Sequence, residues 1–357
     1  MEVPAVPVAP SAEISAFRVV AMGGGTGLST LLKGLKHYVP AAGELYSAQG
    51  RAVGAVISDL TAVVTVTDDG GSTGLLRREF NILAPGDIRN CIVALSEDEA
   101  LLSRLFQFRF PAESHLTGHS FGNLFLLAMT NITGDFAEAV QLSSEILATR
   151  GTILPSTTSN VNLEALMDDG SRVSGETNIT ASDKRIVEIS MVPPDAKPLT
   201  QTLNAISEAD LITIGPGSLF TSLVPNLLVS GISEAIAASS AVKVFVCNLM
   251  TEANESLGLS AAGHISALFQ HAGRRIFDYA LINTRPVSEE TRIAYAQEGA
   301  SQIAVDLESI ERLGVQPILG DYLDEHRTAR HATETVARDL MMLAKSARAH
   351  RSVTSGA

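Results

Sequence analysis

Apolar residues along the chain alternate between short β-branched runs and longer stretches with helical spacing. Residues 17–22 form an apolar strand, Gly23–Gly27 follows it, and leucines recur in helical register over residues 28–37. The same succession of strand, glycine turn and helix returns at residues 210–220. Strands separated by helices of this length need crossover connections, so the pattern predicts a mostly parallel α/β sheet with helices on both faces.

The remaining elements follow from the same periodicities and from turn residues. Asp87 and Asp98 are candidate helix caps, and residues 40–60 carry loop signals, although residues 53–57 can extend the strand that follows. We expect helices at 28–37, 88–95, 98–110, 123–130, 136–148, 203–208, from about 220, at 232–238, 261–271 and 333–347, and strands at 17–22, 62–67, 187–192, 210–214, 243–247 and 279–282.

Residues 151–192 have a different character from the rest. Thr, Ser, Asn, Val and Glu alternate there, and Asp168–Gly170 is a hairpin signal. We expect a small antiparallel β subdomain at 151–192, inserted in one α/β domain over 17–332. A disordered tail at 1–16 and a C-terminal helix with a frayed end, at 333–357, would flank this domain.

Composition narrows the class of protein. Aromatic residues make up 5% of the chain and Trp is absent, so Val, Ile, Leu and Ala must build the core, as suits a covered parallel sheet. The formal net charge of −13 argues against a nucleic-acid partner, whereas a small anion can still bind to backbone N–H groups. Cys91 and Cys247 lie in apolar runs and are expected to be buried thiols. Without a membrane-length apolar stretch or a basic leader before Arg18, we expect a cytoplasmic protein with no membrane insertion.

The first glycine turn is a candidate phosphate site. A strand that ends in glycines just before a helix places free N–H groups and a positive dipole end at one point. Gly23 and Gly25 fit a dinucleotide-binding fingerprint, but Leu28 stands at its third glycine position and no acidic residue follows at the expected distance, so a standard NAD-binding half is not indicated. A packing turn without a ligand is the alternative. The candidate residues are Gly23, Gly24, Gly25, Thr26 and Gly27.

A second glycine turn follows the strand at 210–214. Gly215, Gly217 and Ser218 repeat the arrangement, and Asn248 follows a further strand on the same rim of the sheet. Two such turns in one sheet suit a diphosphate or dinucleotide-like ligand better than one does. A rigid Pro-Gly turn is the alternative.

Asp68 and Asp69 end the strand at 62–67. Strand C-termini face the ligand crevice in open α/β sheets, so these carboxylates are candidates for binding Mg²⁺ or ribose hydroxyls. An Asp-Gly turn with a capping carboxylate is the alternative, although residues 70–74 hold more glycine than a simple turn needs.

The segment Gly118–Gly122 fits the G-x-S-x-G pattern of hydrolases, with Ser120 as the nucleophile. A nucleophile elbow must follow a strand, and residues 110–117 do not read as one. We therefore expect Ser120 and Asn123 to open a helix, with the flanking glycines allowing close packing or ligand approach. Three histidines without metal-ligand spacing, His119, His264 and His271, are expected to be structural or surface residues.

Six strings in this order resemble the CofD/YvcK family, and more closely its YvcK branch, the gluconeogenesis factors. They span most of residues 17–330 and are Val19–Gly27, Val64–Gly74, Pro85–Asn90, Gly118–Asn123, Gly215–Ser218 and Val246–Thr251. The chain departs from that branch at residues 43–60, which look like an insertion, at Leu75, where a longer polar residue is common, and at Ala332, where Asp is usual.

The resemblance implies a Rossmann-like fold and two different activities. CofD members transfer a phospholactyl group from a guanosine diphospho-lactate to a deazaflavin alcohol with Mg²⁺. YvcK-like members look like cytoplasmic regulators that bind UDP-sugars such as UDP-N-acetylglucosamine, linked to cell shape, wall synthesis and gluconeogenic growth. In that branch a Tyr and an Arg near the C-terminus serve UDP-sugar binding, and local context carries them to Tyr295 and Arg330.

Three hypotheses follow. The first is a nucleotide-sugar sensor, with the glycine turns on the diphosphate, Asp68 and Asp69 on ribose or a Mg²⁺ ion that accompanies the nucleotide, and Tyr295 and Arg330 at the sugar. The second is a Mg²⁺-dependent transferase in which Asp68 or Asp69 holds the metal. The third is a serine hydrolase built on Ser120. For the first, homo-oligomers and protein partners in wall synthesis remain open.

Overall fold

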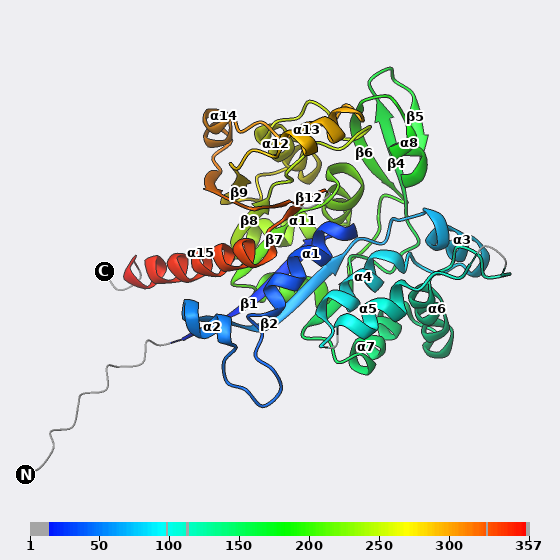
Figure 1. The fold of residues 1–357 in the computed structure, drawn as a ribbon, viewed down its shortest axis with the longest axis horizontal. Helices are drawn as coiled ribbons and strands as arrows, with labels where there is room; N and C mark the ends of the chain where they lie inside the picture. Colours follow the sequence, from blue (N-terminus) through cyan, green and yellow to red (C-terminus); the bar gives the residue numbers. More distant parts are fainter. Residues whose placement is uncertain (1–13, 98, 112–113, 326–327, 355–357) are drawn as a thin grey trace, which may run out of the picture.

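Seven parallel strands form the central sheet in the order β10-β9-β8-β7-β1-β2-β3. The computed structural model describes residues 14–97, 99–111, 114–325 and 328–354 (Figure 1). The predicted fold class, a Rossmann-like parallel sheet with a small antiparallel part, is confirmed. The strands are β1 (Ser15–Gly23), β2 (Ala55–Val64), β3 (Thr152–Pro155), β7 (Leu211–Ile214), β8 (Val242–Val246), β9 (Tyr279–Asn283) and β10 (Gln316–Gly320).

The order of the strands reverses beside β1. The chain runs from β1 to β2 and β3 in one direction, then returns to β7 on the other side of β1 and continues outward to β10. Val20 of β1 is thus paired with Thr61 of β2 on one side and with Ile212 of β7 on the other. Such a reversal opens a crevice at the carboxyl ends of the two diverging strands, where ligands bind in open α/β sheets.

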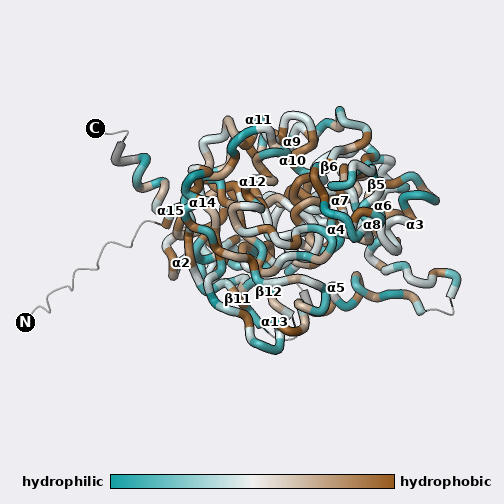
Figure 2. Tube along the Cα trace, turned by 90° about the horizontal axis from the view of Figure 1, so that it is seen from above, coloured by the Kyte–Doolittle hydropathy of each residue, from teal (hydrophilic) through white to brown (hydrophobic). Residues whose placement is uncertain are grey.

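Helices cover both faces of the sheet. On one face α1 contacts both α4 and α15, and the three lie in front of the sheet in Figure 1. Seen from above, α9, α10 and α11 lie along one side, and α5, α13 and the hairpin of β11 (Leu323–Glu325) and β12 (Ala329–His331) along the opposite side (Figure 2). The helices are α1 (Gly25–Lys36), α2 (Ala48–Val53), α3 (Gly71–Phe80), α4 (Gly86–Leu95), α5 (Glu99–Gln107), α6 (Phe121–Thr133), α7 (Phe136–Ile146), α8 (Glu176–Ala181), α9 (Thr200–Glu208), η1 (Leu219–Leu223), α10 (Val224–Leu228), α11 (Ile232–Ala238), α12 (Ala261–Ala272), α13 (Glu289–Ala296), α14 (Leu307–Arg312) and α15 (Thr333–Thr354).

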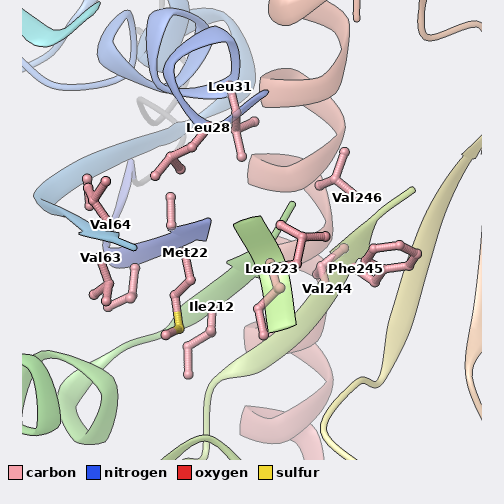
Figure 3. Close-up of a cluster of buried hydrophobic side chains, with 14 of the residues drawn as sticks. Met22, Leu28, Leu31, Val63, Val64, Ile212, Leu223, Val244, Phe245 and Val246 are labelled. Carbon is pink, nitrogen blue, oxygen red and sulfur yellow. The ribbon is translucent and has the colours of Figure 1, made fainter. Parts of the chain in front are cut away.

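Aliphatic side chains build the core between these layers, as the low aromatic content predicts. Figure 3 shows Met22 of β1 beside Ile212 of β7, Val244 of β8 farther along the sheet, and Leu28 of α1 above the sheet. All four are buried. Because parallel strands are covered on both faces, their residues are apolar in continuous runs.

The small antiparallel sheet has the order β5-β4-β6, with strands β4 (Asn162–Met167), β5 (Arg172–Ser174) and β6 (Ile186–Val192). The hairpin expected at Asp168–Gly170 joins β4 to β5. The structure corrects the expected start at residue 151, because β3 belongs to the main sheet and pairs with β2. A second hairpin consists of β11 (Leu323–Glu325) and β12 (Ala329–His331).

Several expected boundaries differ in the structure. β1 begins at Ser15, inside the tail expected at 1–16, and the rest of that tail, 1–13, lies outside the described residues. The residues expected as an insertion at 43–60 form α2 and the first part of β2. The C-terminal helix continues to Thr354, where we expected fraying from Arg348. Arg348 explains this, since its guanidinium lies 3.9 Å from the Phe17 ring centroid and donates to the Ala16 carbonyl oxygen.

Among the described residues, no single helix is both long and apolar enough to cross a membrane. Leu219–Leu228 and Ile232–Ala238 meet that criterion only as a pair bent by 80°.

Candidate functional site

The two glycine turns meet at the point where the strand order reverses. β1 delivers Gly24 and Gly25 to the start of α1, and β7, next to it in the sheet, delivers Gly217. A Cβ on Gly27 would lie 2.2 Å from the Pro216 carbonyl oxygen and 2.9 Å from the Gly217 Cα. Glycine is therefore required here because the two backbones touch.

A cavity of about 580 Å³ opens over these turns. The pair of turns lines it together with residues from five elements, α1, α4, α5, α13 and the β12 strand. This volume lies in the range of pockets that hold cofactor-sized ligands. Of the predicted site residues, those that line it are Gly24, Gly25, Thr26, Gly27, Gly217, Ser218, Asn248, Tyr295 and Arg330.

The start of α1 is a polar end of the cavity. Gly24 caps the helix without any side-chain hydrogen bond, and Gly25 has a φ of +59°, which favours glycine. The helix dipole and the first N–H groups make this end attractive to an anion. The carboxylate of Asp87 is such an anion, because it accepts from the Gly25 N–H.

We had expected Asp87 to cap the helix that follows it, but it does not. It lies in the first turn of α4, whose cap is Pro85, and its side chain is directed to the glycine turn of α1. Burial raises the pKa of Asp87 to about 6, and the nearby Asp68 adds to the rise, whereas the Gly25 N–H and Arg89 oppose it.

The second turn is held rigidly by Asn248. Its Oδ1 accepts from the Gly217 N–H at 3.1 Å, and its Nδ2 donates to the Gly217 carbonyl at 2.8 Å. The oxygen and the nitrogen of the Asn248 side-chain amide thus both hold the turn. The Gly217 N–H donates to Asn248 and is therefore not available to a ligand. The segment that follows is the π-helical turn η1, where we expected an ordinary helix to begin.

Tyr295 of α13 and Arg330 of β12 line the same cavity as the glycine turns. Tyr295 is partly buried and packs against a small apolar cluster that includes Met250. Arg330 is exposed; its backbone pairs with Asp324 of β11, and its guanidinium forms no hydrogen bond or ion pair with another described residue. Next to it, His331 bonds through Nε2 to the Cys247 carbonyl, and burial lowers its pKa to about 4. The His331 ring is therefore neutral at physiological pH.

A second cavity, of about 250 Å³, adjoins the first and shares Asn90 with it. Asp68 and Asn123 line this second cavity and not the first. Asp69 lies outside both cavities, because its Oδ1 accepts from the Thr177 N–H and hydroxyl of α8. The two adjacent carboxylates thus diverge. Within the part of the chain that the structure describes, no group of three or more His, Cys, Asp and Glu side chains is arranged to hold a metal ion, so a Mg²⁺ ion bound by both Asp68 and Asp69 stays an expectation.

Ser120 has a structural position. Its hydroxyl is fully buried, caps α6 by accepting from the Asn123 N–H, and accepts from Arg89 at 2.6 Å. Ser120 is itself an isolated bridge residue, opposite Arg109, and the described residues just before it form a turn and not a strand, so the segment is not a nucleophile elbow. Gly23 and Gly215 also lie outside both cavities and shape the strand ends beneath the turns.

The remaining singled-out side chains are structural. His271 accepts from the Ile189 N–H and joins α12 to the small sheet, and His264 bonds to the Ser260 carbonyl. His119 bonds to the Ser72 hydroxyl. Cys91 and Cys247 are free and buried, as expected.

Sequence reasoning missed three side chains that shape the site. Lys33 of α1 and Asn90 of α4 line the main cavity, and Asp87 contacts the glycine turn of α1. Helical spacing carried a signal for Lys33, because it lies two turns after Thr26 on α1. Asp87 and Asn90 belong to the string Pro85–Asn90 that carries the family resemblance, but periodicity and spacing gave no comparable signal for them, since only the packing of α4 on α1 brings them there.

Comparison with known proteins agrees with the resemblance. The family profile described as 2-phospho-L-lactate transferase CofD matches residues 19–323. The chain is 45% identical over 325 residues to the gluconeogenesis factor of Halalkalibacterium halodurans, covering 90% of this chain and 95% of that one. It is 44% identical over 329 residues to the gluconeogenesis factor of Bacillus subtilis, covering 92% and 98%.

Solved structures extend the agreement to three dimensions. A crystal structure of a Bacillus halodurans protein superposes with a TM-score of 0.84 at 43% identity, covering 91% of this chain and 99% of that one. A second crystal structure from the same organism, described as a member of the UPF0052 family, gives a TM-score of 0.83. The chain therefore belongs to the CofD family, on the branch whose members are named gluconeogenesis factors.

Proposed function

We propose that this protein binds a nucleoside-diphosphate sugar, of the UDP-N-acetylglucosamine type, in the cavity over the two glycine turns. The main support for this proposal is that the two turns, about 190 residues apart in sequence, touch each other and line one cavity of about 580 Å³. A diphosphate needs several donors converging on adjacent phosphoryl groups, and helix starts provide them without cationic side chains.

The donors available to the diphosphate are specific. The N–H groups of Thr26 and Gly27 belong to the first turn of α1, and the hydroxyl-bearing Ser218 and Ser222 line the same cavity. Lys33 lines the cavity farther along α1 and adds positive charge. In this arrangement Tyr295 and Arg330, which line the same cavity, contact the far end of the ligand.

The relatives' name supplies the biological context of the proposal. We propose a regulatory rather than a catalytic role in gluconeogenic growth, in the cytoplasm, with effects on cell shape and wall synthesis and with protein partners to match. A sensor requires only differential binding, so the absence of a reacting group in the proposed contacts is no obstacle.

Calorimetry with UDP-N-acetylglucosamine tests the proposal, and Gly25→Ala is the informative variant. A Cβ at Gly25 enters open cavity space 3.7 Å from the Ser222 Oγ, where the phosphate would sit, so affinity should fall at least about tenfold. Gly273→Ala is the matched control, because Gly273 also has a positive φ, +67°, with nothing within 4 Å of the added Cβ, and it ends α12 outside the cavity. Absence of binding to the unaltered chain at millimolar ligand rejects the proposal, and equal affinities of the two variants reject the assigned position.

A second candidate is a Mg²⁺-dependent phospholactyl transferase. The family profile carries that activity in its description, and Asp68 lines the cavity next to the proposed diphosphate site. Asp68 would hold the metal, and the glycine turns would orient the donor. Turnover of a guanosine diphospho-lactate with a deazaflavin alcohol and Mg²⁺, lost in Asp68→Asn, would support this candidate, and no turnover removes it.

A further inference from the structure

The second cavity is built by the starts of three helices. Gly71 begins α3, Gly86 begins α4, and Asn123 lies in the first turn of α6, and all three line the same space of about 250 Å³. The positive ends of three helix dipoles therefore converge on it. Among the described residues, Asn90 is the one that lines both cavities.

Two arginines add to this positive field. Arg89, largely buried, donates to three neutral oxygens, those of Ser120 at 2.6 Å, Asn123 at 3.0 Å and Asn90 at 3.0 Å. Its Nε is buried without a hydrogen-bond partner in the part of the chain that the structure describes. Arg109, exposed at the mouth, donates to the Gly118 carbonyl.

Neither guanidinium forms an ion pair within the described residues. Burial lowers the pKa of Arg89 and the like charge of Arg109 lowers it further, whereas the charges of Asp87 and Asp68 raise it. A largely buried cation without a carboxylate at ion-pair distance is costly, and a second cation beside it increases the cost.

The carboxylates of Asp68 and Asp87 line the same cavity and attract Arg89, but neither forms an ion pair with Arg89 or Arg109 within the described residues. Asp68 accepts from the Gly70 N–H at 2.8 Å, and Asp87 accepts from the Gly25 N–H of α1. Both carboxylates thus bond to backbone groups and not to a guanidinium. The Nε of Arg89 keeps a donor without a partner among the described residues.

We propose that the second cavity binds a compact oxyanion, the carboxylate or phosphate end of a small metabolite, between Arg89 and Arg109. A guanidinium fork suits such planar or tetrahedral oxyanions, and the helix starts complete the donor set. The site stands whether or not the main cavity takes a nucleotide sugar. Through Asn90, it is adjacent to whatever the main cavity binds.

Thermal-shift titration of the full chain with inorganic phosphate, and separately with acetate and glycolate, tests the proposal at constant ionic strength. We expect saturable stabilisation of the unaltered chain by one of these anions, with the dissociation constant raised about tenfold or more in Arg109→Gln. Because Arg109 is exposed, this variant should fold normally. Arg78→Gln, at an exposed arginine of α3 outside both cavities, removes the same charge and should leave binding unchanged.

The two anion types and a third variant localise the effect. Phosphate alone or carboxylates alone acting through Arg109 would each support the site and identify the ligand's anionic group. Stabilisation that Gly25→Ala abolishes and Arg109→Gln leaves intact belongs to the main cavity and overturns the proposal. No saturable stabilisation by any of the three anions, or equal losses in Arg109→Gln and Arg78→Gln, overturns it as well.

Discussion

Asp87 occupies one of the positions that a phosphoryl group would use at the start of α1. Its carboxylate accepts from the Gly25 N–H, so a bound diphosphate meets a negative charge there. Protonation of Asp87 removes that repulsion, and with a pKa of about 6 the change falls just below neutral pH.

Acidification should therefore tighten binding of a nucleotide sugar. The diphosphate diester has no group that titrates between pH 5.5 and 7.5, and His331 is already neutral because its pKa is about 4. We expect the affinity to rise as the pH falls through about 6, where Asp87 becomes protonated. The Asp87→Asn variant should bind about tenfold more tightly at pH 7.5, since a unit charge a few ångströms away is worth about 1 kcal/mol or more.

Calorimetry at pH 5.5, 6.5 and 7.5 measures both effects. Asp69→Asn removes the same charge from a residue that follows β2 and lies outside both cavities. This variant should keep the pH dependence of the unaltered chain. An Asp87→Asn protein with unchanged affinity and an unchanged pH profile would contradict this role of Asp87.

For single residues, the sequence predicted those site residues that a neighbouring strand or turn motif marks. The glycine turns and Asn248 follow strands directly, so their position on the rim could be inferred from order alone. Asp87 and Asn90 reach the cavities through the contact of α4 with α1, more than 50 residues away in sequence, and no local pattern encodes that contact. Asp69, adjacent to Asp68, was placed in the site because spacing cannot tell which way each carboxylate turns.

Arg77 connects elements of the main domain and the small sheet. It is buried on α3 and donates to the carbonyls of Thr67 at 3.1 Å and Asp68 at 3.0 Å, at the end of β2. Its other nitrogen donates to Val161 at 2.6 Å, just before β4, and to the side chains of two asparagines beside it. One guanidinium thus joins three segments.

Removing this guanidinium should destabilise the fold. In Arg77→Gln several buried carbonyl groups lose their donor, and we expect the free energy of unfolding to drop by about 3 kcal/mol. Arg78→Gln is the control, because Arg78 is the next residue of the same helix and is exposed. Urea unfolding followed by circular dichroism measures the difference. Similar midpoints for the two variants would show that the buried network contributes little.

Element prediction succeeded where periodicity was strong. Most strands with continuous apolar runs, and the helices after them, were expected within a few residues of their observed ends, whereas β2 begins seven residues before the expected strand and α15 ends seven residues after the expected helix. The helix α3 was missed because its first residues, Gly71–Gly74, have the composition of a loop. Gly74 is glycine for packing, since a Cβ there would lie 1.8 Å from the Asp69 carbonyl oxygen. The sequence assigned β3 to the small sheet because pairing partners are not visible in a single strand.

Two glutamates, Glu255 and Glu176, are shielded from water in a chain that carries a net charge of −13. Burial raises the pKa of Glu255 to about 8, and the neighbouring Glu252 carboxylate adds to the rise. Burial also raises the pKa of Glu176 to about 9, with Asp68 as the next contribution. Both carboxyls bind protons more tightly in the folded chain than in the unfolded one.

The stability of the molecule should therefore fall as the pH rises. A carboxyl with a raised pKa in the folded state stabilises it fully below the unfolded value, and this stabilisation is lost as the pH rises from about 4.5 through about 8 for Glu255. Replacing Glu255 by Gln removes this loss, so the melting temperature at pH 8.5 should exceed that of the unaltered chain by roughly 2 °C or more.

Scanning calorimetry at pH 5.5 and 8.5 provides the measurement. Glu79→Gln, at an exposed position of α3, matches the change in charge and should shift both melting temperatures alike. If Glu255→Gln melts at or below the unaltered chain at pH 8.5, the carboxyl does not carry the expected penalty.

The fold class of the whole molecule was within reach of the sequence, but the strand order was not. Alternating strands and helices require a parallel sheet, whereas the return of the chain from β3 to the far side of β1 depends on contacts between distant segments. That return creates the cavity, so the location of the site could be expected only in outline.

The central position of β1 also has a consequence for biosynthesis. Val19–Met22 pairs with Leu211–Ile214, so during translation one edge of this strand has no native neighbour until nearly 200 further residues have left the ribosome. An apolar edge exposed for that long invites pairing with other nascent chains. Expression of this protein should thus depend on chaperones that shield its first half until β7 arrives.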